Sequence, residues 1–152
     1  MEKVFHFDSP SGHYVADAAV LLCIDQRFNL AALKFVKRKK IVKPDWIMVA
    51  GAAKTLASPH TDFERNFILE QIRISIQLHN TQRVILTCHS DCGAYGGLAA
   101  HGGDREAEAI HHTKELERAA EVVRANFPDV TVETYLINFE GVWDTSTMPG
   151  GK

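Results

Sequence analysis

Two short segments of the chain carry side chains that together could bind a metal ion. Residues 23–27 read Cys-Ile-Asp-Gln-Arg, and residues 88–93 read Cys-His-Ser-Asp-Cys-Gly. His89 and Cys92 can both reach one ion across a turn, and zinc readily accepts this mixture of imidazole and thiolate. With Cys23 as a further ligand, one tetrahedral position stays open to water, as in catalytic rather than structural zinc sites. The sequence therefore predicts a catalytic Zn2+ ion bound by Cys23, His89 and Cys92.

Two charged side chains follow Cys23 at alternate positions. Alternate side chains of an extended segment share one face, so we expect Cys23, Asp25 and Arg27 to project in the same direction. A pair of thiolates cancels the charge of the ion, which then acidifies its water less than an ion with only neutral imidazole ligands does. We therefore expect Asp25 to accept a hydrogen bond from the bound hydroxide and to orient it. Arg27 would hold Asp25 in a bidentate ion pair.

The two segments must meet in space, and the hydrophobic pattern of the chain indicates how. We predict buried strands at residues 15–25, 45–51, 83–90 and 130–138. Continuous apolar runs such as residues 20–24 are typical of strands that are covered on both faces, as in parallel sheets. Both candidate segments lie at the carboxyl ends of predicted strands, where open α/β sheets bind their ligands. The topology therefore allows the segments to converge.

Helical periodicity fills the intervals between the predicted strands. The expected apolar stripes of the successive helices are Leu30, Leu33 and Val36; Ile68, Ile72 and Ile76; and Ala109, Thr113, Leu116, Ala120, Val123 and Phe127. The second helix opens with a capping box in which Thr61 caps the amide of Glu64 and Glu64 reaches back. The tail after Gly141 is expected to be irregular. The alternation predicts an α/β fold: a single three-layer domain over residues 1–152, with its core at about 15–138, on a mostly parallel sheet of about four strands flanked by helices.

The composition limits the kinds of partner. Hydrophobic residues make up 45% of the chain and charged residues 24%, and the formal net charge of −2 gives no global attraction to nucleic acid or anionic lipid. No apolar run is long enough to span a bilayer. The odd number of cysteines, 3, does not suggest a disulfide framework. We expect a cytoplasmic protein that acts on a small-molecule substrate and binds neither nucleic acid nor membrane.

The same two segments carry a family resemblance. The chain resembles the β-class carbonic anhydrases, which have C-x-D-x-R after the first core strand and H-x-x-C-G after the third, and both motifs are unbroken here. The resemblance implies that Cys23, His89 and Cys92 bind zinc and that Asp25 and Arg27 form the orienting pair. It implies a lyase that reversibly hydrates carbon dioxide to bicarbonate, with zinc-bound hydroxide as the nucleophile. It also implies a homodimer or a higher homo-oligomer.

Departures from the family pattern leave other functions open. Family members commonly have Arg-Asn-Ala-Gly-Asn after the second strand, where residues 48–52 of this chain read Met-Val-Ala-Gly-Ala. The pocket therefore has less polar support, and a hydrolase of a related heteroallene, carbonyl sulfide or carbon disulfide, is one alternative. A non-catalytic zinc-binding domain, or a thiol- or redox-sensing domain, is another, because Cys88 lies beside the site and could pair with Cys92.

Other cysteine and histidine residues have simpler predicted roles. Cys88 is expected to be an inert core residue that points away from the metal site on the opposite face of its strand. The glycine-rich residues 93–103 are expected to form the one long flexible loop, on which His101 could relay a proton from the site. His111 and His112 lie beside the apolar stripe of the third helix, where we expect them to be solvated.

Overall fold

The sheet of the computed structural model, which describes residues 1–145, has five strands in the order β2-β1-β3-β4-β5. The strands are β1 (Ala18–Leu22), β2 (Pro44–Met48), β3 (Arg83–His89), β4 (Thr131–Ile137) and β5 (Val142–Asp144). The first four run parallel to their neighbours, whereas β5 pairs antiparallel with β4. The predicted α/β fold on a mostly parallel sheet is confirmed.

The sheet has one strand more than the sequence predicts. Part of the tail after Gly141, expected to be irregular, forms β5 along the outer edge of β4, and the rest of that prediction, from residue 146 on, lies outside the described residues. Asn138 closes the turn between them, because its side-chain oxygen accepts the N–H groups of Glu140 and Gly141 at 2.9 Å. Such a short edge strand has too little periodicity to be recognised from its residues alone.

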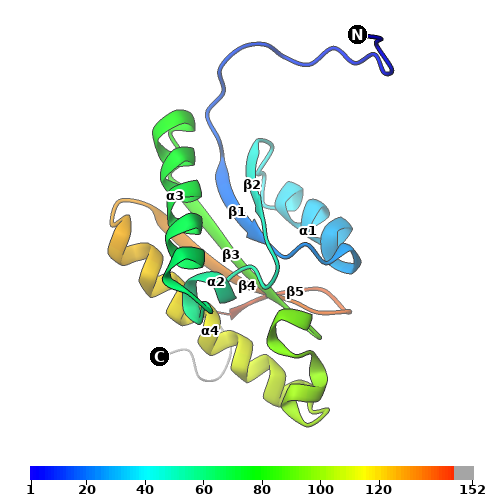
Figure 1. The fold of residues 1–152 in the computed structure, drawn as a ribbon, viewed down its shortest axis with the longest axis vertical. Coiled ribbons are helices and arrows are strands. Elements are labelled where there is room, and N and C mark those ends of the chain that lie inside the picture. The colour runs from blue at the N-terminus through cyan, green and yellow to red at the C-terminus, as the bar shows by residue number, and fades with distance from the viewer. Residues whose placement is uncertain (146–152) are drawn as a thin grey trace.

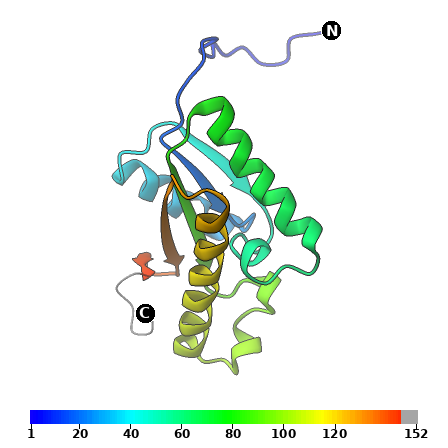
Figure 2. The same cartoon turned by 90° about the vertical axis from the view of Figure 1, so that its left-hand side faces the viewer.

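Helices cover both faces of the sheet. They are α1 (Gln26–Arg38), α2 (Lys54–Ala57), α3 (Asp62–His79) and α4 (Arg105–Asn126), with the short 3-10 helices η1 (Gly93–Tyr95) and η2 (Leu98–His101). Figures 1 and 2 show α1 on one side of the sheet and α2, α3 and α4 on the other. The predicted flexible loop at 93–103 is largely taken up by η1 and η2. None of the helices in the described part of the chain is long and apolar enough to cross a membrane.

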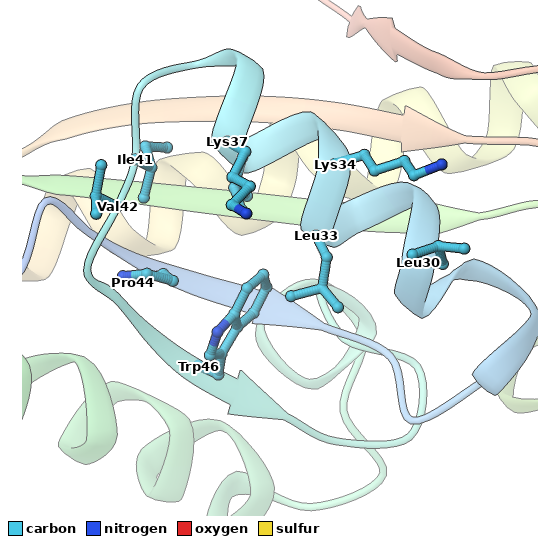
Figure 3. Close-up of a pocket in the computed structure, with 9 residues that line it drawn as sticks. Leu30, Leu33, Lys34, Lys37, Ile41, Val42, Pro44 and Trp46 are labelled. Carbon is cyan, nitrogen blue, oxygen red and sulfur yellow. The ribbon is translucent and has the colours of Figure 1, made fainter. Parts of the chain in front are cut away.

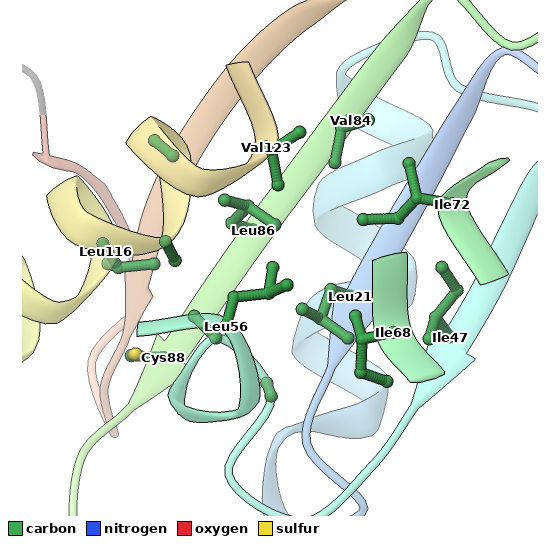
Figure 4. Close-up of a cluster of buried hydrophobic side chains, with 14 of the residues drawn as sticks. Leu21, Ile47, Leu56, Ile68, Ile72, Val84, Leu86, Cys88, Leu116 and Val123 are labelled. Atoms are coloured by element: carbon green, nitrogen blue, oxygen red, sulfur yellow. The ribbon is translucent and has the colours of Figure 1, made fainter. Parts of the chain in front are cut away.

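The larger hydrophobic core lies between the sheet and α2, α3 and α4 (Figure 4). Alternate residues of β1 and β3, such as Leu21 and Leu86, face this core, which also contains Leu116 of α4. The intervening residues Val20 and Ile85 belong to a smaller cluster on the α1 side. Full burial of one such side chain stabilises the fold by about 1.5–3 kcal/mol. A shift of one residue in the pairing of a strand would move its side chains to the opposite face of the sheet. Burial of the two clusters therefore determines the strand register.

Helix α1 buries a different line of residues from the predicted one. Phe28, Ala32 and Val36 are buried, whereas Leu30 and Leu33 are 62% and 48% exposed. The predicted stripe of Leu30, Leu33 and Val36 is therefore wrong for its first two members. Phe28 and Ala32 pack on the ends of β1 and β4, and this tertiary contact decides which side of the helix faces the sheet.

Capping side chains determine where α3 and α4 begin. The Thr61 hydroxyl accepts the N–H of Glu64 at 3.4 Å, as predicted. Glu64 does reach back, but its carboxylate accepts the N–H of His60 at 2.9 Å rather than that of Thr61. Asp104 caps α4 by accepting N–H groups of the first turn. These bonds satisfy amides that a helix cannot satisfy internally.

Residues 1–15 form no helix or strand and extend away from the sheet (Figure 1). Tyr14 anchors the end of this segment, because its hydroxyl donates to the Asp45 carboxylate at 2.6 Å. Asp45 also accepts a hydrogen bond from Ser75 at 2.5 Å and lies 2.7 Å from His79 Nδ1. Contact with the folded core therefore starts just before β1.

Candidate metal centre

The ends of β1 and β3 bring Cys23, His89 and Cys92 together. The two strands are parallel neighbours, so the residues that follow them meet at the same edge of the sheet. One ligand atom of each residue lies within 4.8 Å of the others, and all three side chains are buried. With bonds of about 2.0–2.3 Å, the ligand atoms of a tetrahedral zinc are about 3.3–3.8 Å apart. Movements of about 1 Å would therefore let the three side chains share one ion.

One buried nitrogen of His89 has no hydrogen-bond partner. His89 Nδ1 lies 2.9 Å from the Ser90 carbonyl oxygen, which can only accept, so Nδ1 carries a proton and donates it. The other nitrogen, Nε2, is enclosed without a partner among the described residues. Burial opposes the charged form of His89, but the Cys23 sulfur and the Ser90 carbonyl raise its pKa overall. A metal ion would use the Nε2 lone pair, because a carbonyl on the other ring nitrogen orients an imidazole ligand in this way.

The two sulfurs favour a single thiolate between them. Contact with Cys92 lowers the pKa of Cys23, and His89 and the Gly51 amide act in the same direction against burial. The Gly51 N–H donates to Cys23 Sγ at 3.3 Å. The contact with Cys23, together with burial, raises the pKa of Cys92. A divalent cation would stabilise both thiolates, the form in which cysteine binds metals. The donor set and the free imidazole nitrogen therefore fit a metal ion.

Asp25 and Arg27 form the predicted bidentate pair, but with a different backbone geometry. Arg27 Nε donates to Asp25 Oδ1 at 3.0 Å, and Nη2 donates to Oδ2 at 2.6 Å. Asp25 is the N-cap of α1 and Arg27 lies in its first turn, so the expected extended segment is wrong. The Arg27 guanidinium lowers the pKa of Asp25 to about 2. Asp25 Oδ2 lies 3.9 Å from His89 Nε2, so the carboxylate borders the candidate ligands.

A second carboxylate, that of Asp91, holds Arg27 from the other side. Arg27 Nη1 donates to Asp91 Oδ2 at 2.9 Å, and Nη2 donates to the Asp91 carbonyl at 3.1 Å. Asp91 has a φ of 56°, a left-handed conformation that Asp adopts more readily than most residues. Sequence reasoning missed this residue. Its position inside the second motif, between His89 and Cys92, was the available signal.

Comparison with known proteins gives the family of the chain. The family model described as "Putative carbonic anhydrase" matches residues 15–146, a range that contains both motifs. The chain belongs to this carbonic anhydrase family. An uncharacterized protein of Rickettsia bellii (strain RML369-C) is 28% identical over 130 residues, which cover 84% of this chain and 79% of the relative.

Solved structures share the fold of this carbonic anhydrase family member. The β-carbonic anhydrase isoform I of Trichomonas vaginalis has a TM-score of 0.62 at 14% identity, covering 92% of this chain and 87% of that one. An apo form of carbon disulfide hydrolase has a TM-score of 0.55 at 14% identity, covering 89% and 82% of the two chains. At these identities the similarity shows the fold, and the chemistry must be argued from the residues of this chain.

In this family member Cys88 lies on the opposite face of β3 from His89. Cys88 belongs to the core beneath α4 (Figure 4). The His89 ring instead packs on Phe28 of α1, with ring centroids 4.6 Å apart. The Cys88 sulfur is 3.7 Å from the Tyr95 hydroxyl, and burial raises the pKa of the thiol to about 12. A thiol with so high a pKa is a poor nucleophile. This environment is that of the inert core cysteine that the sequence predicts.

Cavity size alone would point to a different part of the molecule. A cavity of about 440 Å³ lies between α1 and β2 and is lined by Leu30, Leu33 and Trp46 among others (Figure 3). None of the candidate zinc ligands lines it. A smaller cavity of about 260 Å³ borders Asp91 and Phe139, next to the centre. The donor atoms, not the volume, therefore identify the candidate site.

The histidines outside the centre are placed differently from the prediction. His112, expected to be solvated, is fully buried on α4, and His111 is partly buried. The helix packs that side against η1 and η2, where the ring of His112 meets Tyr95 with centroids 4.7 Å apart. His101 ends η2 and lies against the ring of His111 at 4.9 Å. The relay role of His101 stays a prediction.

Proposed function

We propose that this chain is a zinc-dependent carbonic anhydrase that reversibly hydrates carbon dioxide to bicarbonate. The observation that supports the proposal is the buried convergence of Cys23, His89 and Cys92, with the Nε2 lone pair of His89 free. Cysteine and histidine together form a ligand set that zinc favours, and one coordination position is left for water. Zinc in such a site supplies an acidified water as the nucleophile.

Asp25 would orient that nucleophile. Because Arg27 lowers its pKa to about 2, Asp25 is ionised at neutral pH and can only accept hydrogen bonds. Its carboxylate borders the ligand cluster, so it can accept a hydrogen bond from the attacking oxygen and direct the oxygen lone pair at the substrate carbon. Arg27 is a positioning residue, because it binds Asp25 bidentately and keeps the carboxylate from moving onto the metal.

Metal analysis and a hydration assay together test the proposal. We expect the purified chain to hydrate carbon dioxide in a stopped-flow assay, to lose this activity when a chelator removes zinc, and to regain it when zinc is returned. Cys92→Ser should lose the sulfur-bound zinc and the activity, whereas the matched control Cys88→Ala should keep both. A wild-type chain that holds zinc through sulfur and hydrates no carbon dioxide would overturn the proposal.

A related heteroallene is the second candidate substrate. Met48, Val49 and Ala52 are apolar where carbonic anhydrases commonly have polar residues, which favours a less polar substrate. The fold is also shared with a carbon disulfide hydrolase. Sulfide release from carbon disulfide or carbonyl sulfide, measured on the same preparation, separates the two activities. Sulfide release without carbon dioxide hydration would favour this candidate, and zinc binding without either activity would leave a non-catalytic zinc domain.

A further inference from the structure

We propose a second metal site in this chain, formed by His101, Glu108 and His112, that binds a divalent transition metal ion such as Zn2+. One ligand atom of each residue lies within 4.8 Å of the others. The three side chains come from η2 and α4, not from the strand ends that carry Cys23 and His89. The site is therefore distinct from the proposed catalytic centre and contains no sulfur.

Helix geometry places two of the ligands on one face of α4. Glu108 and His112 are four positions apart, so they lie one above the other on successive turns of the helix. Glu108 Oε1 is 3.8 Å from His112 Nε2. Glu108 is 1% exposed and His112 is 0% exposed. His101, at the end of η2, completes the group from outside the helix.

Buried nitrogen atoms without partners point to a ligand at this position. Neither ring nitrogen of His112 has a hydrogen-bond partner among the described residues, and the same holds for His101 Nε2. The edge-on contact of the His112 ring with Tyr95 explains its burial but satisfies neither nitrogen. Buried polar groups of folded proteins are nearly always satisfied. A cation that accepts an imidazole lone pair would satisfy the nitrogen that faces Glu108.

The donor chemistry selects the class of ion. Imidazole nitrogens suit zinc and other late first-row metals, and a carboxylate oxygen supplies negative charge next to them. Nitrogen and oxygen ligands of a tetrahedral ion, at about 2.0–2.2 Å from it, are about 3.3–3.5 Å apart. Binding would therefore draw these side chains together by about 1.5 Å at most.

A hydrogen bond connects this group with the proposed catalytic centre. Glu108 Oε1 also accepts the backbone N–H of Asp91 at 2.7 Å, and Asp91 binds Arg27 at 2.9 Å. A metal ion on Glu108 would hold the carboxylate in place and so support the backbone of Asp91. We therefore assign the second ion a structural role beside the catalytic centre.

Zinc stoichiometry combined with X-ray absorption tests the proposal on the full chain. We expect wild-type protein, stripped with a chelator and then dialysed against Zn2+ alone, to hold about two zinc ions, with sulfur ligands at about 2.3 Å and nitrogen or oxygen ligands at about 2.0–2.2 Å. His112→Gln should lower the stoichiometry to about one and raise the sulfur share of the remaining shell. His111→Gln, a change of the neighbouring residue outside the group, should keep about two.

A second variant, at the partly buried residue His101, tests the site even if the His112 variant does not fold. His101 lies at the end of a surface 3-10 helix, so His101→Gln should fold even if the change at His112 does not, and it should give the same loss of one zinc. Wild-type protein with a single zinc in a sulfur-containing shell would overturn the proposal, and so would His101→Gln protein that keeps both ions. A single zinc with nitrogen and oxygen ligands only would support the second site and overturn the proposed catalytic one.

Discussion

Arg27 is the side chain that connects the parts of the candidate centre. Its guanidinium binds Asp25 after β1 and Asp91 after β3, so one residue links the two motifs across neighbouring strands. A guanidinium is suited to this role, because its planar donors can serve two carboxylates at once. The carboxylate that borders the candidate metal ligands is thereby kept ionised and fixed in direction.

Replacing Asp25 tests the orienting role without removing the helix cap. Asparagine caps helices as well as aspartate does, so Asp25→Asn should fold and bind zinc normally. The loss of the charged acceptor should lower kcat for carbon dioxide hydration by roughly 100-fold, the size of loss expected when a reacting oxygen is no longer oriented. Asp104→Asn, the same change at the cap of α4, is the matched control and should keep full activity. An Asp25→Asn enzyme with wild-type kcat would refute the role.

Gly51 is a residue at which a single methyl group should disturb the centre. It has a φ of +80°, and an added Cβ would lie 2.9 Å from the Cβ of Ala94. We expect Gly51→Ala to lower the free energy of unfolding by about 1–3 kcal/mol and to weaken zinc binding, since the Gly51 amide donates to Cys23. Gly102 also has a positive φ, but an added Cβ there would have no atom within 4 Å. The variant Gly102→Ala therefore separates the effect of backbone strain from that of the steric clash. Chemical unfolding and zinc titration of both variants measure the difference, and equal losses would rule out the clash.

At the scale of elements, an ion cluster joins α1 to the sheet. Glu133 of β4 binds Arg83 of the neighbouring strand β3, and it binds Lys39 at the end of α1 at 3.1 Å. Burial alone would raise the pKa of Glu133, but hydrogen bonds from Arg83, Tyr135 and Lys39 lower it to about 2. The charged form of Glu133 is therefore the one that stabilises the packing of these elements.

The stability contributed by Glu133 should depend on pH. A glutamate whose pKa is lowered on folding contributes stability above its unfolded pKa of about 4.3, and this stability is lost as the pH falls through the folded value. Glu133→Gln should lower the free energy of unfolding by about 1–2 kcal/mol at pH 7, and the difference from wild type should shrink below about pH 4. Urea unfolding between neutral and acidic pH, with the exposed Glu121→Gln as the control, measures this effect. A difference independent of pH would contradict it.

At the scale of the whole molecule, exposed apolar side chains gather where α1 meets the edge strand β2. Leu30, Leu33 and Trp46 line one cavity between α1 and β2 (Figure 3). A second cavity is lined by Leu33, Trp46 and Met48. Among residues 1–145 the strand order places β2 at the edge of the sheet, where it pairs with β1 alone. An apolar surface of this kind often becomes an interface between copies of a chain.

We predict that the purified chain is a homo-oligomer assembled through this surface. Leu33→Glu should lower the mass measured by size-exclusion chromatography with light scattering, because a carboxylate would be buried at the contact. Ile74→Glu places the same charge on exposed apolar surface of α3, on the other side of the sheet, and should leave the mass unchanged. A monomeric wild-type chain would exclude the assembly.

Hydrophobic runs and two short motifs were sufficient to predict most of the fold and to select the residues that we propose as zinc ligands. The strands around Leu21 and Leu86 are recognisable because each contains the continuous apolar run that is typical of a buried parallel strand. Their carboxyl ends then mark where Cys23 and the second motif must lie. These features depend on residues close together in the chain, which is why the sequence by itself determined them.

Only the tertiary structure decided which distant residues support the centre. The contact of Asp91 with Arg27, the buried group around His112, and the side of α1 that faces the sheet all depend on packing between elements far apart in the chain. Periodicity describes one element at a time, so it misassigned Leu33 to the core and His112 to the solvent. The hydrophobic contacts that orient each helix exist only once the sheet has formed.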